Sequence, residues 1–207
     1  MQAEIDALIE TFSADEYIIN IIRRAMTNAQ DIMIESKSHG YIIILAKEAE
    51  YFAKVDNLPE FCNMSAKSLK ITVLNEKKLN EYKTGIGRNI DELLWQAGYY
   101  ASNGRLLEGC FWNDVIKLNY WPNFTRLPMT PNSLRIAALL AVHPVTIEHT
   151  ILVLKVKREE VYQFYCASLC AGAVSTIKGN GDAPIPSLKP HRRNALLGLL
   201  LSKIASI

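Results

Sequence analysis

The order of apolar and polar positions predicts a helix followed by a β-hairpin near the start of the chain. Apolar side chains recur at helical spacing over residues 17–29, after a Ser13 and Glu16 pair that fits a capping box. Two β-branched runs follow, residues 31–36 and 41–46, separated by KSHG. Because Gly40 accepts a positive φ without steric cost, these two runs predict a hairpin.

The next segments complete a first unit. Residues 46–55 return to a helical pattern, and residues 68–74 alternate as a strand does. We therefore expect a small α+β unit over residues 1–82. A polar stretch with two glycines, residues 83–88, predicts a linker, and it lacks the Lys-Ser/Thr pair of a phosphate-binding loop.

Aromatic residues gather after this linker. Residues 89–104 predict a helix with Asn103 and Gly104 at its C-terminal end, and residues 115–121 predict a strand. Among the aromatic side chains here, Trp95, Trp112, Trp121 and Phe124 all fall within 30 residues. Such density indicates either a second core or a packing surface between two domains.

Three short helices are predicted next. The first covers residues 133–142, with Thr130 as its cap, and ends before a proline. The second covers residues 146–154, a tight turn follows at 155–157, and the third helix covers 159–174. This order and the short turn before the last helix are typical of a helix-turn-helix. The sequence VSTIKGNGDA then predicts a strand and the start of a wing.

Over residues 130–180 the chain resembles winged helix-turn-helix domains, a superfamily used by many bacterial transcriptional regulators. The resemblance rests on the pattern of helices and on turn lengths. It implies that the third helix reads base edges while flanking cations contact phosphates.

The third helix has few of the side chains that this role requires. It begins with Glu159 and Glu160, which repel phosphate, and only Gln163, Ser168 and Tyr162 could contact a base. Residues 129–177 hold four basic against three acidic side chains. Domains that bind DNA through phosphate neutralisation usually carry a larger positive excess.

Two sets of candidate site residues follow. If the domain binds DNA, the phosphate contacts are Lys155, Lys157, Arg158 and Lys178. If it binds protein, the candidate partner surface is Tyr162, Tyr165 and Gln163, because the third helix carries more aromatic surface than a core requires. We favour the protein-contact interpretation.

For the last residues, 182–207, the sequence predicts a proline-containing linker and an amphipathic helix. The leucines of residues 196–201 cover more than half of a helical wheel, with Arg192, Arg193 and Lys203 at the ends. Such a helix can dock on its own chain, bind a neighbouring subunit or lie on a membrane surface. Docking on its own chain is the favoured outcome, and the membrane surface is the least favoured.

Composition and candidate chemistry change this picture little. The formal net charge of +2 does not favour a nucleic-acid-binding polycation. The four cysteines are too scattered for a disulfide framework or a zinc ribbon and predict buried thiols. The four histidines lack metal-ligand spacing, and no nucleophile motif is present. We expect no metal and no cofactor.

The sequence as a whole predicts an α+β protein: a small α+β N-terminal unit, then an aromatic-rich segment with a winged-helix-like domain over residues 89–181. We expect a cytoplasmic, non-enzymatic regulatory or scaffolding protein that acts through protein contacts, with self-association as a homo-oligomer. The alternative is a DNA-binding transcriptional regulator with an N-terminal sensing domain.

Overall fold

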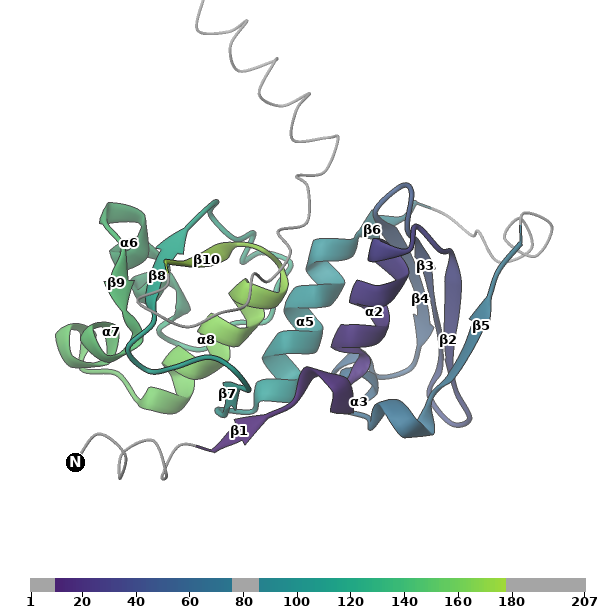
Figure 1. The fold of residues 1–207 in the computed structure, drawn as a ribbon, viewed down its shortest axis with the longest axis horizontal. Coiled ribbons are helices and arrows are strands. Elements are labelled where there is room, and N and C mark those ends of the chain that lie inside the picture. The colour runs from purple at the N-terminus through teal and green to yellow at the C-terminus, as the bar shows by residue number, and fades with distance from the viewer. Residues whose placement is uncertain (1–9, 76–85, 178–207) are drawn as a thin grey trace, which may run out of the picture.

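The computed structural model describes residues 10–75 and 86–177 and shows an α+β fold (Figure 1). Its larger sheet is antiparallel, with five strands in the order β5-β2-β3-β4-β6. These strands are β2 (Ile32–Ser36), β3 (Gly40–Leu45), β4 (Glu50–Val55), β5 (Lys70–Val73) and β6 (Arg88–Asn89). β3 lies in the middle, and the four consecutive apolar side chains at its end are buried, two of them in the core under the helices and two in a smaller cluster on the opposite face.

Helices cover one face of this sheet. They are α2 (Ile18–Thr27), α3 (Leu58–Cys62) and α5 (Ile90–Ser102), with short 3-10 helices η1 (Ala14–Glu16) and η2 (Ala66–Ser68). Figure 1 shows α2 and α5 side by side against the sheet. The opposite face carries a smaller apolar cluster around Ile43, Leu45 and Leu74.

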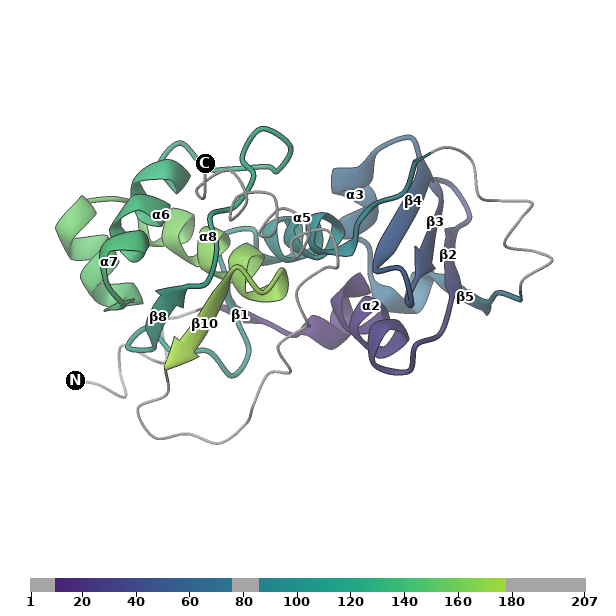
Figure 2. The same cartoon turned by 90° about the horizontal axis from the view of Figure 1, so that it is seen from above.

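A second group of helices lies on the far side of α5 from the sheet (Figures 1 and 2). It consists of α6 (Ser133–Val142), α7 (Ile147–Leu154) and α8 (Arg158–Cys170). Beside these helices lies an antiparallel sheet in the order β10-β8-β9, formed by β10 (Val174–Ile177), β8 (Val115–Leu118) and β9 (Val145–Thr146). A parallel pair, β1 (Thr11–Phe12) and β7 (Leu106–Leu107), joins the start of the described chain to the end of α5.

One hydrophobic core runs through both groups. It includes Ile22 of α2, Ile44 of β3, Trp95 of α5, Ile136 of α6 and Phe164 of α8. α5 packs on the sheet side against α2 and on the other side against α8. The division at residues 83–88 stays a prediction, but β6 begins at Arg88 within that range and pairs with β4.

Two side-chain contacts hold the segment before α6 against α5. Trp95 donates a hydrogen bond from Nε1 to the carbonyl oxygen of Pro128 at 2.9 Å. The Glu92 carboxylate, mostly buried, accepts from Arg88 at 2.9 Å and from Arg126 at 3.2 Å. The aromatic-rich segment therefore belongs to the packing around α5.

The structure confirms the predicted hairpin, the strand near residues 68–74, the helices near 17–29 and 89–104, and the three helices after residue 130. α5 ends where predicted, with Asn103 as its C-cap in the αL conformation. These elements do not test the winged-helix resemblance, which stays a prediction. The predicted turn GNGD after β10 lies outside the described residues, and the strand that pairs with β10 is β8, which precedes the helices.

The predicted helix over residues 46–55 is wrong. Ala49 has a positive φ of 53° and forms part of a turn, so residues 50–55 return along β3 as strand β4. Tyr51 on this strand points into the core on the helix side and is fully buried. Pairing with the apolar central strand outweighs the helical periodicity of this segment.

Two predicted helix caps are also wrong. Ser13 makes no side-chain capping bond and precedes η1, so α2 begins only after Tyr17. Asn132 rather than Thr130 stands before the first turn of α6. The Thr130 backbone N–H instead donates to the Ser133 hydroxyl at 2.9 Å, and both side chains are buried.

Candidate interaction surface

The structure places the expected partner surface of the third helix in the interior. Tyr162 and Tyr165 of α8 are 5% and 0% exposed, and Gln163 is partly buried. The Gln163 side chain donates from Nε2 to the backbone oxygen of Tyr99 in α5 at 3.1 Å. The expected exposure of the two tyrosines is therefore wrong, because other parts of the same chain cover them. The Tyr165 hydroxyl, for example, donates to the Asp114 carboxylate just before β8 at 3.5 Å.

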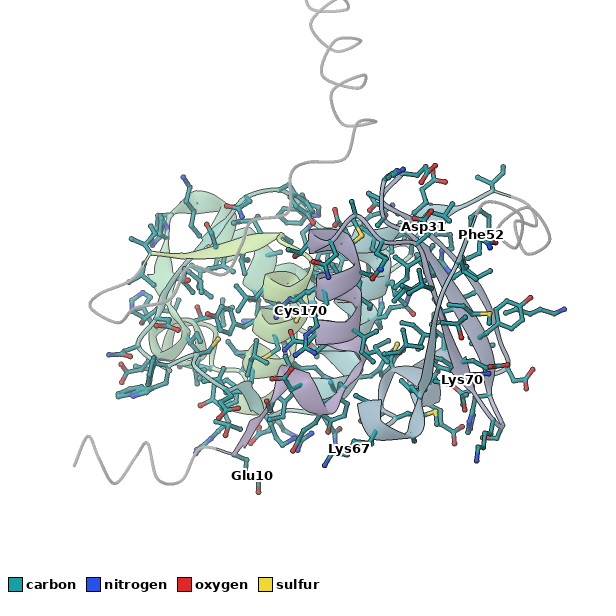
Figure 3. All side chains as sticks on the ribbon, turned by 45° about the vertical axis from the view of Figure 1, so that its right-hand side comes forward. Glu10, Asp31, Phe52, Lys67, Lys70 and Cys170 are labelled. Carbon is teal, nitrogen blue, oxygen red and sulfur yellow. The ribbon has the colours of Figure 1, made fainter. Side chains whose placement is uncertain are left out.

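The side of α8 that holds Gln163 packs closely on α5. A Cβ atom placed on Gly98 would lie 2.8 Å from the Cys166 backbone oxygen, 2.9 Å from the Cys170 Sγ and 3.0 Å from the Ala167 Cα. Such distances leave no room for a side chain, so the glycine lets the two helix backbones approach. Figure 3 shows Cys170 among these interior helices.

The side chains that could have read bases are consequently not available. Ser168 is buried and donates its hydroxyl to the Phe164 backbone oxygen at 2.7 Å, while Gln163 is engaged with α5. Along α8, exposed side chains occur only in the first turn, at Arg158 and Glu159. A helix-turn-helix reads DNA by laying this helix in the major groove. In this structure α5 covers the Gln163 side of α8, and Tyr162 and Ser168 are buried.

Three of the four predicted phosphate contacts do lie together at the surface. Lys155, Lys157 and Arg158 are exposed at the turn between α7 and α8, where Lys155 takes an αL conformation with φ 52°. Lys178, the fourth, lies outside the described residues. The sequence prediction therefore located a basic turn correctly.

α6 and α7 carry an exposed apolar face that was not predicted from the sequence. The exposed positions of α6 recur on one side of the helix and are Leu134, Arg135, Ala138, Ala141 and Val142, of which four are apolar. Val142 is 77% exposed, and on α7 the exposed side chains include Leu152, which is 65% exposed, and Val153. We call the surface formed by Leu134, Ala138, Ala141, Val142, Leu152 and Val153 the α6–α7 face.

The basic turn borders one end of this face. Arg135 donates from Nη2 to the backbone oxygen of Leu154 at 3.0 Å, so the first turn of α6 meets the last turn of α7. Arg135 also donates to Asn132, whose amide in turn donates to Glu160 of α8 at 2.8 Å. These bonds place the start of α6 beside Lys155 and the start of α8. The exposed acidic side chain among them is Glu159.

The sequence carried a sign of this face. The helix SLRIAALLAV has one charged residue in ten positions and is apolar on all sides. A surface helix normally places polar side chains away from the core, so a helix that is apolar all round indicates a second covered face. In the structure, Ile136, Ala137 and Leu140 pack into the core and the remaining apolar side chains face outward.

The cysteines lie in the interior. All four cysteines are buried, which confirms the expected buried thiols. Burial raises the pKa of Cys62 and of Cys110 to about 12, so both are protonated thiols at neutral pH. Burial also raises the pKa of the Tyr165 hydroxyl, which lies 3.5 Å from an Asp114 oxygen. Within residues 10–75 and 86–177, no three His, Cys, Asp or Glu side chains are arranged to hold a metal ion.

Comparisons with models of protein families, with curated proteins and with solved structures find no match to the chain. Among the described helices, none combines the length and the apolar character that crossing a membrane requires.

Proposed function

We propose that the chain is a non-enzymatic regulatory or scaffolding protein that acts through protein contacts, and that the α6–α7 face is its contact surface. The observation that carries this proposal is a helix, α6, with apolar side chains on its outward face as well as on its buried face. Clusters of exposed apolar side chains next to polar rims mark interaction sites on soluble proteins. Here the rim is the basic turn at Lys155, Lys157 and Arg158.

The chemistry of this surface fits one kind of partner. Apolar centres on two neighbouring helices accept the apolar side of an amphipathic helix. Four exposed cations, Arg135, Lys155, Lys157 and Arg158, stand at one end against a single exposed carboxylate, Glu159. The partner segment is therefore an amphipathic helix with leucine-like side chains and acidic residues toward one end.

Two synthetic peptides test this proposal. They share one stripe of leucines at i, i+3, i+4 and i+7 spacing and carry either glutamates or lysines at one end. We expect the glutamate peptide to bind at least about tenfold more tightly at low salt, measured by fluorescence anisotropy, because the rim is basic. Replacing both Leu152 and Val153 with serine will weaken this binding about tenfold through loss of apolar contact.

A matched control removes exposed apolar side chains elsewhere. Ile71 and Val73 of β5 are comparably exposed, and their double replacement with serine will leave peptide binding unchanged. Equal affinity for the two peptides, or equal effects of the two double variants, would show that the α6–α7 face is not the contact surface.

The second candidate function is DNA binding, supported by the exposed basic turn alone. Because the base-reading positions of α8 are covered, we expect no discrimination between duplex sequences and dissociation constants no tighter than the nonspecific range of about 10⁻⁶ to 10⁻⁴ M at physiological salt. Binding of two unrelated 20-base-pair duplexes at low and moderate salt measures this, with Lys157 and Arg158 both replaced by glutamate as a control. Submicromolar binding to one duplex only would overturn the protein-contact proposal in favour of a regulator of transcription.

A further inference from the structure

The free edge of the five-stranded sheet is formed by β5. β5 ends the sheet order, and among the residues that the structure describes no strand pairs with it on the side away from β2. Figures 1 and 2 both place β5 at the outer end of the molecule, opposite to α6 and α7. Open strand edges present unpaired N–H and C=O groups and bind other strands unless they are blocked.

The hydrogen-bond pattern of β5 shows which groups face outward. The Leu74 N–H donates to the Asp31 oxygen at 2.9 Å, and the pairing register places these two residues opposite each other. Hydrogen-bonded and non-bonded pairs alternate along an antiparallel ladder. Leu74 and Thr72 therefore direct their backbone groups to β2, whereas Ile71 and Val73 direct theirs to the open edge.

The side chains of the same two residues are exposed. Ile71 is 50% and Val73 is 56% exposed, although both lie on the face of the sheet that α2 covers farther along. Lys70 is the only charged residue of the strand (labelled in Figure 3). Its Nζ lies 3.2 Å from a carboxylate oxygen of Glu35 in β2. Among the described residues, the edge thus combines backbone groups that no strand pairs, exposed apolar side chains and a charged residue that already has a partner.

We propose that β5 pairs antiparallel with β5 of a second copy of this chain, around a two-fold axis through Thr72. In this register Ile71 lies opposite the Val73 of the second copy, and all outward N–H and C=O groups of both residues form hydrogen bonds. Lys70 lies opposite Leu74, so no like charges meet. A two-fold contact of this kind uses the same surface on both copies and closes on itself. The pairing joins two sheets into one of ten strands and gives a structural form to the self-association that the sequence predicts, beyond the proposed function of the α6–α7 face.

A cysteine at the axis tests the register. Thr72 lies opposite its own copy as a non-bonded pair, with Cα atoms about 4.5 Å apart, which suits a disulfide. We expect Thr72→Cys to form a disulfide-linked dimer with oxidised glutathione, seen on a non-reducing gel. Ile71→Cys will not crosslink to itself because its copy is two positions away, and Lys54→Cys on the exposed part of β4 serves as the control for random collisions. Crosslinking of all three variants at one rate would overturn the proposed register.

A proline tests the pairing without introducing a thiol. Because the Val73 N–H faces the open edge, Val73→Pro removes no hydrogen bond to β2 and is tolerated by the edge strand of a single copy. It removes two symmetry-related bonds between copies, so we expect the dimer dissociation constant, from light scattering over a concentration series, to rise at least about tenfold.

Folding of the proline variant is checked by circular dichroism. Peptide binding at the α6–α7 face, measured on the same variant, separates failure of this proposal from failure of the proposed function. A native chain that stays monomeric at about 0.1 mM, or a folded Val73→Pro variant that dimerises as before, would refute the pairing of β5 edges.

Discussion

Replacing Trp95 with alanine will lower the free energy of unfolding by about 3–5 kcal/mol, the range for removal of a buried aromatic side chain. Trp95 is 1% exposed and makes edge-to-face contacts with Phe124 and Phe164, with ring centroids 5.9 and 5.8 Å apart. The replacement also leaves the Pro128 oxygen without its indole donor. Urea unfolding followed by circular dichroism measures the loss.

The matched control is Trp121→Ala. Trp121 is also edge-to-face with Phe124, at 6.3 Å, but half of its surface is exposed. Its removal leaves no closed cavity, and we expect a loss below about 1 kcal/mol. Similar losses for the two variants would show that the aromatic-rich segment does not pack on α5 as the structure has it.

The α+β class and most elements could be predicted because their periodicity agrees with their tertiary role. The hairpin of β2 and β3 carries β-branched runs, and α2 has one apolar side facing the sheet. β4 could not be predicted, because residues 46–55, which include it, fit a helix equally well on local grounds. Its strand conformation depends on pairing with β3 and on the turn at Ala49. Ala49 has a positive φ, which an alanine in the sequence does not indicate.

The role of α8 was missed for a different reason. Its aromatic side chains were interpreted as surplus surface because the sequence does not show which element packs on them. One element that packs on α8 is α5, which lies more than 60 residues earlier in the chain. This contact depends on Gly98 against Ala167. Small residues at matching positions of two distant helices are recognised only after the helices are placed together.

The basic turn after α7 was predictable, because three cations within four residues at a helix boundary are exposed in most folds.

The two proposed surfaces have a joint consequence. β5 and the α6–α7 face lie at opposite ends of the molecule (Figures 1 and 2), so pairing through β5 leaves both copies of the α6–α7 face free. A dimer would then present two partner surfaces directed apart. Two linked partner segments would bind such a dimer more tightly than one segment binds one copy, provided that the linker spans the dimer. This bivalence is what a scaffolding role requires.

Replacing Gly98 with leucine will lower the free energy of unfolding by about 3 kcal/mol, near the upper end for overpacked cores. The first added carbon already meets the Cys166 backbone oxygen at 2.8 Å, and a backbone atom in a helix cannot move away alone. Gly98→Ala will cost less, because alanine regains about 1 kcal/mol of helix propensity. The control Ala138→Leu, on the exposed side of α6, will change stability by no more than about 0.5 kcal/mol.

A second substitution examines the cause of this loss. Cys170→Ala removes the sulfur that lies 2.9 Å from the added Cβ, but it leaves the Cys166 oxygen in place. The double variant Gly98→Ala with Cys170→Ala will therefore lose less stability than the two single variants together, with a coupling of about 0.5 kcal/mol or more in urea unfolding. Strict additivity, or a Gly98→Leu variant as stable as the native chain, would mean that α5 does not lie against α8. In that case the Gln163 side of α8 would be accessible, and Gln163 would return as a candidate contact residue.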